Sequence, residues 1–202
     1  EGFNHMHDPP KMIWLRGNPD NHIWNNRKNI CVIGSRRGTR YGYDSCMKII
    51  SGLAGYNCTI VSGLAYGIDA EAHKAALAMD IPCIALPGSG LDDDSIYPRE
   101  NLRLAHSILD SGGALMSEFP LDFKATKWTF PLRNRLMASM SDLVLVVEAG
   151  LKSGTYITAF QGLELGKTIG AVPGPINSQV SEGANNLIKL GAYPITCSQD
   201  II

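Results

Sequence analysis

The sequence predicts an α/β fold, an extended Rossmann-like domain with a doubly wound, mainly parallel sheet and helices on both faces. Six short apolar runs alternate with helical patterns along the chain, and such a series of β–α steps is typical of parallel sheets. The runs are rich in Val, Ile and Leu without polar alternation, as expected for strands buried on both faces. With 202 residues, 45% hydrophobic and 18% charged, the chain can bury one ordinary core.

Each apolar run ends at glycine or small polar residues, which place a turn between strand and helix. Strands are expected at residues 30–33, 58–61, 82–86, 114–116, 143–147 and 168–172. Helices are expected at residues 43–54, 68–79, 99–111, 133–140, 155–165 and 184–190. We therefore divide the chain into a lead-in, residues 1–28, and a Rossmann-like domain, residues 29–202. Within the lead-in, residues 1–6 are interpreted as vector-derived, and residues 7–28, rich in Pro, Asn and Trp, as irregular.

Charge and cysteine content exclude several classes of protein. A net charge of −1 does not fit a protein that coats nucleic acid indiscriminately, so any basic contacts must gather on one face. The five cysteines show no metal-ligand spacing and are expected to be free thiols in a reducing compartment. No apolar run approaches the ~18 residues of a membrane helix, and no signal-peptide pattern is present. We expect a cytoplasmic protein without metal, cofactor or membrane partner.

The loop after the first strand, residues 34–42, carries three arginines among glycines. Glycine lets the backbone approach an anion, and Arg36 and Arg37 can contact phosphates in bidentate fashion. The loop fits neither G-x-G-x-x-G nor a Walker loop, because the required glycine spacing and the Lys-Thr ending are absent. It is interpreted as an anion site, with a solvated turn as the alternative.

A second turn of the same type follows the next strand. Ser62 and Gly63 could donate to a phosphate, whereas Asp69 could simply cap the helix that follows. Asp69 and His73 share a helix face, so a catalytic pair is conceivable. A helix-stabilising contact is the favoured interpretation, because no serine or cysteine nucleophile stands at a matching spacing.

Residues 127–135 interleave cations, aromatic rings and an amide. Aromatic faces stack on unpaired bases while Arg and Lys hold the backbone, which is the usual arrangement at single-strand sites. The candidate contacts in this segment are Lys127, Phe130, Arg133, Asn134 and Arg135. The alternative places the rings in the core and the arginines in structural salt bridges.

Residues 152–155 open another helix with small and hydroxyl residues, a geometry suited to anions. Lys152, Ser153, Gly154 and Thr155 are the candidates, although Ser153 could merely cap the helix. Glu118 and Glu148 follow strand ends and could act as acid or base, or could order neighbouring arginines.

Taken in order, these segments resemble the DprA/Smf family of DNA-processing proteins. The matching motifs are Gly34-Ser35-Arg36 with Tyr41-Gly42, Ser62–Asp69 with Ala72-His73, Tyr97-Pro98 with Asn101, Ser117-Glu118-Phe119-Pro120, Phe130–Arg135, Ser153-Gly154-Thr155, Val172-Pro173-Gly174, and Gly183–Asn185 with Gly191-Ala192. The match runs over about residues 8–192, and the number and order of the motifs make the resemblance specific.

The resemblance implies a non-catalytic protein that binds single-stranded DNA, forms a homodimer and helps to load the RecA recombinase during natural transformation. By position, it implies DNA contacts at Arg36 and Lys127 first, then at Phe130, Arg133, Arg135 and the turn 153–155. Many family members also carry a helical domain before the Rossmann domain and a winged-helix domain after it, neither of which is visible in this sequence.

A second hypothesis is a nucleotide-binding or nucleotide-hydrolysing enzyme of the lysine-decarboxylase-like Rossmann group. That group is recognised by Pro-Gly-Gly-x-Gly-Thr with a glutamate downstream. The comparable stretches here are residues 87–90 and 152–155, and no glutamate follows closely enough.

Overall fold

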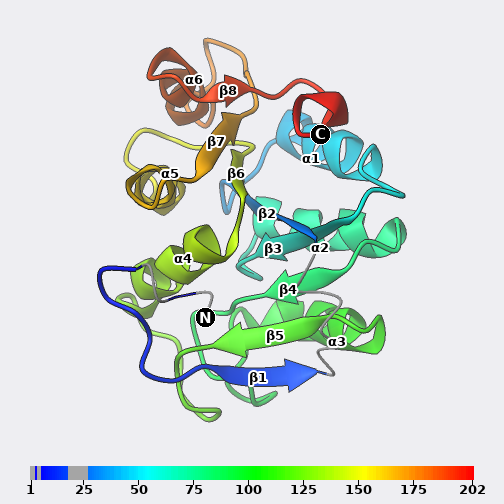
Figure 1. The fold of residues 1–202 in the computed structure, drawn as a ribbon, viewed down its shortest axis with the longest axis vertical. Coiled ribbons are helices and arrows are strands. Elements are labelled where there is room, and N and C mark those ends of the chain that lie inside the picture. Colours follow the sequence, from blue (N-terminus) through cyan, green and yellow to red (C-terminus); the bar gives the residue numbers. More distant parts are fainter. Residues whose placement is uncertain (1–2, 4–5, 18–26) are drawn as a thin grey trace.

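The protein forms one mixed sheet covered by helices on both faces (Figure 1). The computed structural model describes residues 3, 6–17 and 27–202. The described strands are β1 (Trp14–Gly17), β2 (Lys28–Ile33), β3 (Cys58–Ser62), β4 (Cys83–Ala85), β5 (Ala114–Ser117), β6 (Leu143–Val146), β7 (Thr168–Ala171) and β8 (Tyr193–Pro194). Their order in the sheet is β1-β5-β4-β3-β2-β6-β7-β8, and every neighbouring pair is parallel except β1 with β5. The predicted fold class is confirmed.

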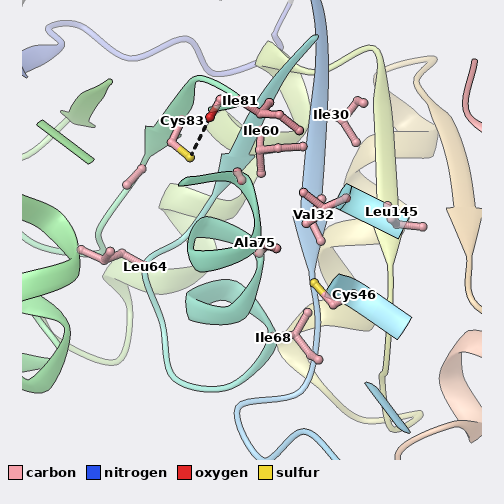
Figure 2. Close-up of a cluster of buried hydrophobic side chains, with 14 of the residues drawn as sticks. Ile30, Val32, Cys46, Ile60, Leu64, Ile68, Ala75, Ile81, Cys83 and Leu145 are labelled. Carbon is pink, nitrogen blue, oxygen red and sulfur yellow. Dashed lines mark hydrogen bonds between the residues drawn. The ribbon is translucent and has the colours of Figure 1, made fainter. Parts of the chain in front are cut away.

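Within the described residues, six α-helices connect the strands. They are α1 (Arg40–Ser51), α2 (Ile68–Ala78), α3 (Leu102–Asp110), α4 (Thr129–Met140), α5 (Gly154–Glu164) and α6 (Glu182–Lys189), with 3₁₀ turns η2 (Arg99–Asn101) and η3 (Ser198–Asp200). Alternate residues of the central strands point to opposite faces, as the two-residue period of a strand requires. Ile30 and Val32 of β2 belong to a core cluster that includes residues of α1, α2 and α3, whereas Cys31 and Ile33 belong to a second cluster that includes residues of α4, α5 and α6. Figure 2 shows part of the first cluster, where side chains from β2, β3 and β6 meet those from α1 and α2.

All six predicted strands and all six predicted helices are present, with ends that differ from the expected ones by a few residues. The largest difference is at α4, which begins at Thr129 rather than at Arg133. Pro131 lies in the first turn of α4, where a missing N–H costs no helical hydrogen bond, so the proline does not delay the helix.

The sequence analysis missed the two strands at the sheet edges. Trp14–Gly17, inside the segment interpreted as irregular, is β1 and pairs with β5. Its four residues alternate between exposed and half-buried, too short a pattern to be recognised as a strand. Strand β8 has only two residues, both exposed. The domain boundary at residue 29 stays a prediction, and the remainder of the lead-in, residues 18–26, lies outside the described residues, as do residues 1–2 and 4–5 of the segment interpreted as vector-derived.

The strand order reverses between β2 and β6. The chain proceeds from β2 through β3, β4 and β5 on one side, and from β6 through β7 to β8 on the other. Loops that leave the carboxyl ends of β2 and β6 therefore diverge and leave a crevice, which is where open α/β sheets bind ligands.

Candidate functional site

A pocket of about 530 Å³ opens at this reversal point. Most of its lining comes from the loop after β2, the start of α4 and the start of α5, and the loop after β3 and the first turn of α2 add two residues. The lining residues are Ile33, Gly34, Ser35, Arg36, Ala65, Asp69, Lys127, Phe130, Pro131, Arg133, Asn134, Met137, Gly150, Ser153, Gly154, Thr155 and Thr158.

The loop after β2 is held against the loop after β3 by close backbone contacts. The N–H of Ile68 donates to the carbonyl of Ser35 over 3.1 Å. Gly67 has φ of 74°, and a Cβ there would overlap the Ser35 carbonyl oxygen. Gly34 likewise leaves room for the Ile68 side chain, which an added Cβ would approach within 2.6 Å. Gly34 and Gly67 therefore fix the position of the loop at Ser35, and with it that of Arg36, the residue after Ser35.

Arg36 and Phe130 form a cation–π pair at the pocket mouth. The Arg36 Cζ lies over the Phe130 ring, 4.7 Å from its centroid. Gly88 permits this ring position, because a Cβ there would come within 2.6 Å of Phe130 Cδ1. The ring holds the guanidinium at the pocket, and a base that stacks on the same face must displace Arg36.

The guanidinium of Arg133 is buried, with only 4% of the residue exposed. It donates to the carbonyls of Gly63 and Leu86 and, over 3.0 Å, to Asn134 Oδ1. Asp69, 5% exposed, supplies a compensating negative charge. Burial raises the pKa of Asp69 and lowers that of Arg133, while each charge opposes the shift of the other. Arg133 thus ties β3, β4 and α4 together beneath the pocket.

The start of α5 contributes backbone groups to the pocket. Ser153 is the N-cap, and its hydroxyl accepts from the Tyr156 N–H over 3.1 Å. The Thr155 hydroxyl donates to the Gly34 carbonyl over 3.0 Å, which joins the β2 loop to α5. Both hydroxyls have structural roles, and the N–H groups at Gly154 and Thr155 belong to the first turn, where a helix supplies no acceptors. Such N–H groups are the usual anion donors of a helix start.

Unpaired cations surround this pocket. Arg36, Arg37, Lys127 and Lys152 are exposed, and no ion pair of the described residues involves them. Arg135 differs, because its Nη2 lies 2.5 Å from Glu118 Oε2 and its Nη1 donates to the Asp8 carbonyl. Glu118 therefore orders an arginine, one of the two roles considered for it.

The structure brings most of the predicted contacts together. Arg36, Lys127, Phe130, Arg133, Asn134, Ser153, Gly154 and Thr155 all line the pocket. Arg37, Ser62, Gly63, Arg135 and Lys152 do not. Ser62 is buried, with its hydroxyl donating to the Val32 carbonyl over 2.7 Å, and a Cβ at Gly63 would overlap the Arg133 guanidinium.

Sequence reasoning missed Met137 and Thr158, which line the inner part of the pocket. The helical period could have found both. Met137 follows Phe130 by seven residues on α4, and Thr158 follows Gly154 by four on α5.

The remaining candidates have structural surroundings. Glu148 is buried and accepts from the N–H and the hydroxyl of Thr39, 2.9 and 2.5 Å away, at the start of α1. His73 is fully buried, and burial lowers its pKa to about 4, so the ring is neutral at physiological pH. No group of three or more His, Cys, Asp and Glu is placed to hold a metal ion among the residues that the structure describes. In the same part of the chain, no helix is long and apolar enough to cross a membrane.

Solved structures with the same architecture include two of DNA processing protein A. The structure from Streptococcus pneumoniae has a TM-score of 0.90 at 35% identity, over 99% of this chain and 68% of that one. The structure from Helicobacter pylori, described for its unique single-stranded DNA binding mode, has a TM-score of 0.88 at 32% identity over 100% of this chain and 89% of that one. The molybdenum cofactor binding protein of Rippkaea orientalis shares the fold alone, with a TM-score of 0.58 at 16% identity.

Sequence comparison points to the same group. Protein Smf of Escherichia coli is 47% identical over 86% of this chain, and DNA processing protein DprA of Bacillus subtilis is 36% identical over 97%. The chain covers 46% and 64% of these relatives, so it spans about half to two thirds of their length. The profile of the DNA recombination-mediator protein A family matches residues 1–202. The chain belongs to the DNA recombination-mediator protein A family, whose DprA/Smf motifs it carries.

Proposed function

We propose that this protein binds single-stranded DNA in the pocket between β2 and β6. The observation that carries the proposal is the pairing of Arg36 with Phe130 at the mouth of a pocket whose wall also holds Lys127. These residues combine exposed positive charge with an aromatic face, the two components of single-strand sites. The helix start at residues 153–155 adds backbone donors for a phosphate.

A single strand fits this arrangement better than a duplex. The cations are local, since the net charge of the whole chain is −1, and the aromatic ring lies in a pocket rather than on a protruding surface. A paired base cannot offer its face to such a ring, whereas an unpaired base can. The Helicobacter pylori relative, described for its single-stranded DNA binding mode, supports the proposal by analogy.

We assign direct contacts to Arg36, Lys127, Phe130, Asn134 and the turn 153–155. Arg37 and Lys152 flank the pocket and contribute to the local positive potential. Arg133 and Arg135 are assigned supporting roles, because their guanidinium groups already bond to protein oxygens.

The finer parts of the function rest on the family. We propose a cytoplasmic, non-catalytic protein that acts as a homodimer, protects incoming single-stranded DNA and helps to load RecA during natural transformation. Analytical ultracentrifugation tests the dimer, and a RecA filament-assembly assay on coated DNA tests the loading.

The nucleotide-hydrolysing alternative is not favoured, because the family profile and the similar full-length proteins belong to the DNA-processing group. Steady release of free base from nucleoside monophosphates would revive it.

Fluorescence anisotropy with matched single- and double-stranded oligonucleotides tests the main proposal. The single strand is expected to bind more tightly, and Arg36→Ala and Lys127→Ala are each expected to weaken that binding. Unchanged single-strand affinity in both variants would exclude this pocket as the site.

A further inference from the structure

Two exposed tyrosines continue the aromatic surface that begins in the pocket. Tyr97 lies 5.8 Å from Phe130 between ring centroids, and Tyr66 lies 6.5 Å from Tyr97. Tyr97 is 44% exposed and Tyr66 37% exposed, although large aromatic rings of a monomeric domain are usually more buried. The three rings form a row that leads out of the pocket.

From this row we infer that Tyr97 and Tyr66 form a second base-stacking subsite, which receives the nucleotides next to the one held at Phe130. The inference rests on the proposed single-stranded DNA function. We call Phe130, Tyr97 and Tyr66 the aromatic row.

The geometry of the row suits an extended strand. Stacked bases in a duplex strand are about 3.4 Å apart, whereas the ring centroids here are 5.8 and 6.5 Å apart. The rings are also inclined to one another by 50° and 79°, so they offer separate faces rather than one continuous stack. Each ring can therefore contact one base of a strand whose own stacking has been opened.

The tyrosines stand on a braced framework rather than on free loops. Asn101 of η2 donates to the carbonyls of Leu64 and Ala65, over 2.9 and 3.1 Å, which fixes the loop that carries Tyr66. Glu100 of the same turn accepts from the Tyr66 hydroxyl over 2.6 Å. Since Tyr97 lies two residues before this turn, one short segment carries one ring and positions the other. Rigid rings lose little conformational entropy when a base binds.

The charges near the row indicate which part of the strand meets it. Hydrogen bonding to Tyr66 lowers the pKa of Glu100, so this carboxylate is ionised and repels phosphates. Arg99, in the same turn, is paired with Asp94 at 3.4 Å. The unpaired cations Arg36 and Lys127 are at the pocket. The phosphates accordingly follow the pocket side, and only the bases reach Tyr97 and Tyr66.

Oligonucleotide length separates this subsite from the pocket. Thymidine oligomers of about 4 and about 16 nucleotides bracket the usual range of single-strand sites. Tyr97→Ala and Tyr66→Ala are expected to weaken binding of the long oligomer by about fivefold or more, the lower end for loss of one base–aromatic contact, and that of the short oligomer far less. Tyr97→Phe keeps the ring and should bind like the wild type.

Tyr56→Ala is the matched control. Tyr56 is a tyrosine of similar exposure, 48%, and it lies just before β3. It is therefore at the amino ends of the parallel strands, whereas the pocket is at their carboxyl ends. Thermal unfolding of each variant checks that the fold is intact. A second measurement does not depend on variants: photo-crosslinking of a 5-iodouracil oligomer to the wild-type protein should label peptides that contain Tyr97 or Tyr66.

The outcomes distinguish failure of the Tyr97–Tyr66 subsite from failure of the proposed DNA binding in the pocket. If the wild type binds, Arg36→Ala weakens binding, and Tyr97→Ala matches Tyr56→Ala without crosslinks to either tyrosine, the subsite is refuted and the pocket stands. Equal losses with both oligomer lengths also refute the subsite as a separate contact. If neither Arg36→Ala nor Lys127→Ala weakens the binding of either oligomer, the proposed binding of DNA in the pocket itself fails.

Discussion

The salt dependence of DNA binding gives the sharpest test of the pocket, through Arg36→Gln and Lys127→Gln. Both side chains are exposed, line the pocket and have no carboxylate partner among the described ion pairs. A single strand gives a slope of log affinity against log salt of about −0.7 for each phosphate neutralised. If each cation neutralises one phosphate, the two together contribute about −1.4 to the slope, and each variant should make it shallower by about 0.7.

Lys28→Gln is the matched control. Lys28 is exposed and begins β2, the strand that leads to the Arg36 loop. It therefore lies at the amino ends of the parallel strands, whereas the pocket lies at their carboxyl ends. Five steps of about 3.3 Å each separate Lys28 from Ile33 by roughly 17 Å. This distance is about twice the Debye length of about 8 Å at physiological salt, so Lys28 should have little effect on the slope.

The slope is measured by fluorescence anisotropy of a labelled thymidine oligomer between about 50 and 200 mM salt. Wild-type slopes in both pocket variants would refute the assignment of these cations to phosphates. An equal change in the Lys28 variant would mean that the strand binds by diffuse charge rather than in the pocket.

Three further predictions concern the framework. Arg133→Met should cost about 3–5 kcal/mol of unfolding free energy in urea at neutral pH, because it leaves the Asp69 carboxylate buried without a compensating charge. The pKa of Asp69, already raised by burial, would rise further, so this deficit should shrink as pH falls through the raised pKa of the variant and should be gone below the usual aspartate range, where Asp69 is protonated in both the folded and the unfolded state; a deficit independent of pH would argue against this cause. Gly67→Ala should lower stability by about 1 kcal/mol or more and weaken single-strand binding, because φ is 74° and the new methyl would overlap the Ser35 carbonyl, and wild-type thermal unfolding would contradict it. With a thiol reagent the native protein should show one fast cysteine, Cys197, since the other four are buried, and two or more fast thiols would contradict the packing.

The central sheet was predictable because its strands are buried on both faces, and such strands are plain apolar runs. Ile30–Ile33 and Leu143–Val146 are examples, and both lie at the point where the strand order reverses. The edge strands could not be recognised in the same way. Strand β1 (Trp14–Gly17) pairs with one strand, β5, and has no continuous apolar run. Its pairing with β5, rather than its own sequence, identifies it as a strand.

The glycine loops of the site were also predictable, but the fate of each arginine was not. Arg36 lies in a loop and Arg133 and Arg135 lie within α4, all among polar neighbours, and local sequence gives no means of ranking the three. Their roles depend on acceptors far away in the chain: Gly63 and Leu86 for Arg133, and Glu118 for Arg135. Arg36 meets a ring rather than an oxygen, so its guanidinium keeps donors for a ligand.

The helical period explains why residues 127–135 could not act as one binding face. Once α4 begins at Thr129, Phe130, Asn134 and Met137 share the side that faces the pocket. Arg135, two positions after Arg133, is turned by about 200° and faces Glu118 instead. The segment interpreted as one basic, aromatic contact region thus lies largely in a helix with a binding side and a supporting side. Loss of Arg135 should therefore reduce stability without changing the salt slope, whereas loss of Lys127, which lies just before α4, should change the slope without reducing stability, and that opposition distinguishes the supporting side of α4 from the pocket wall in solution.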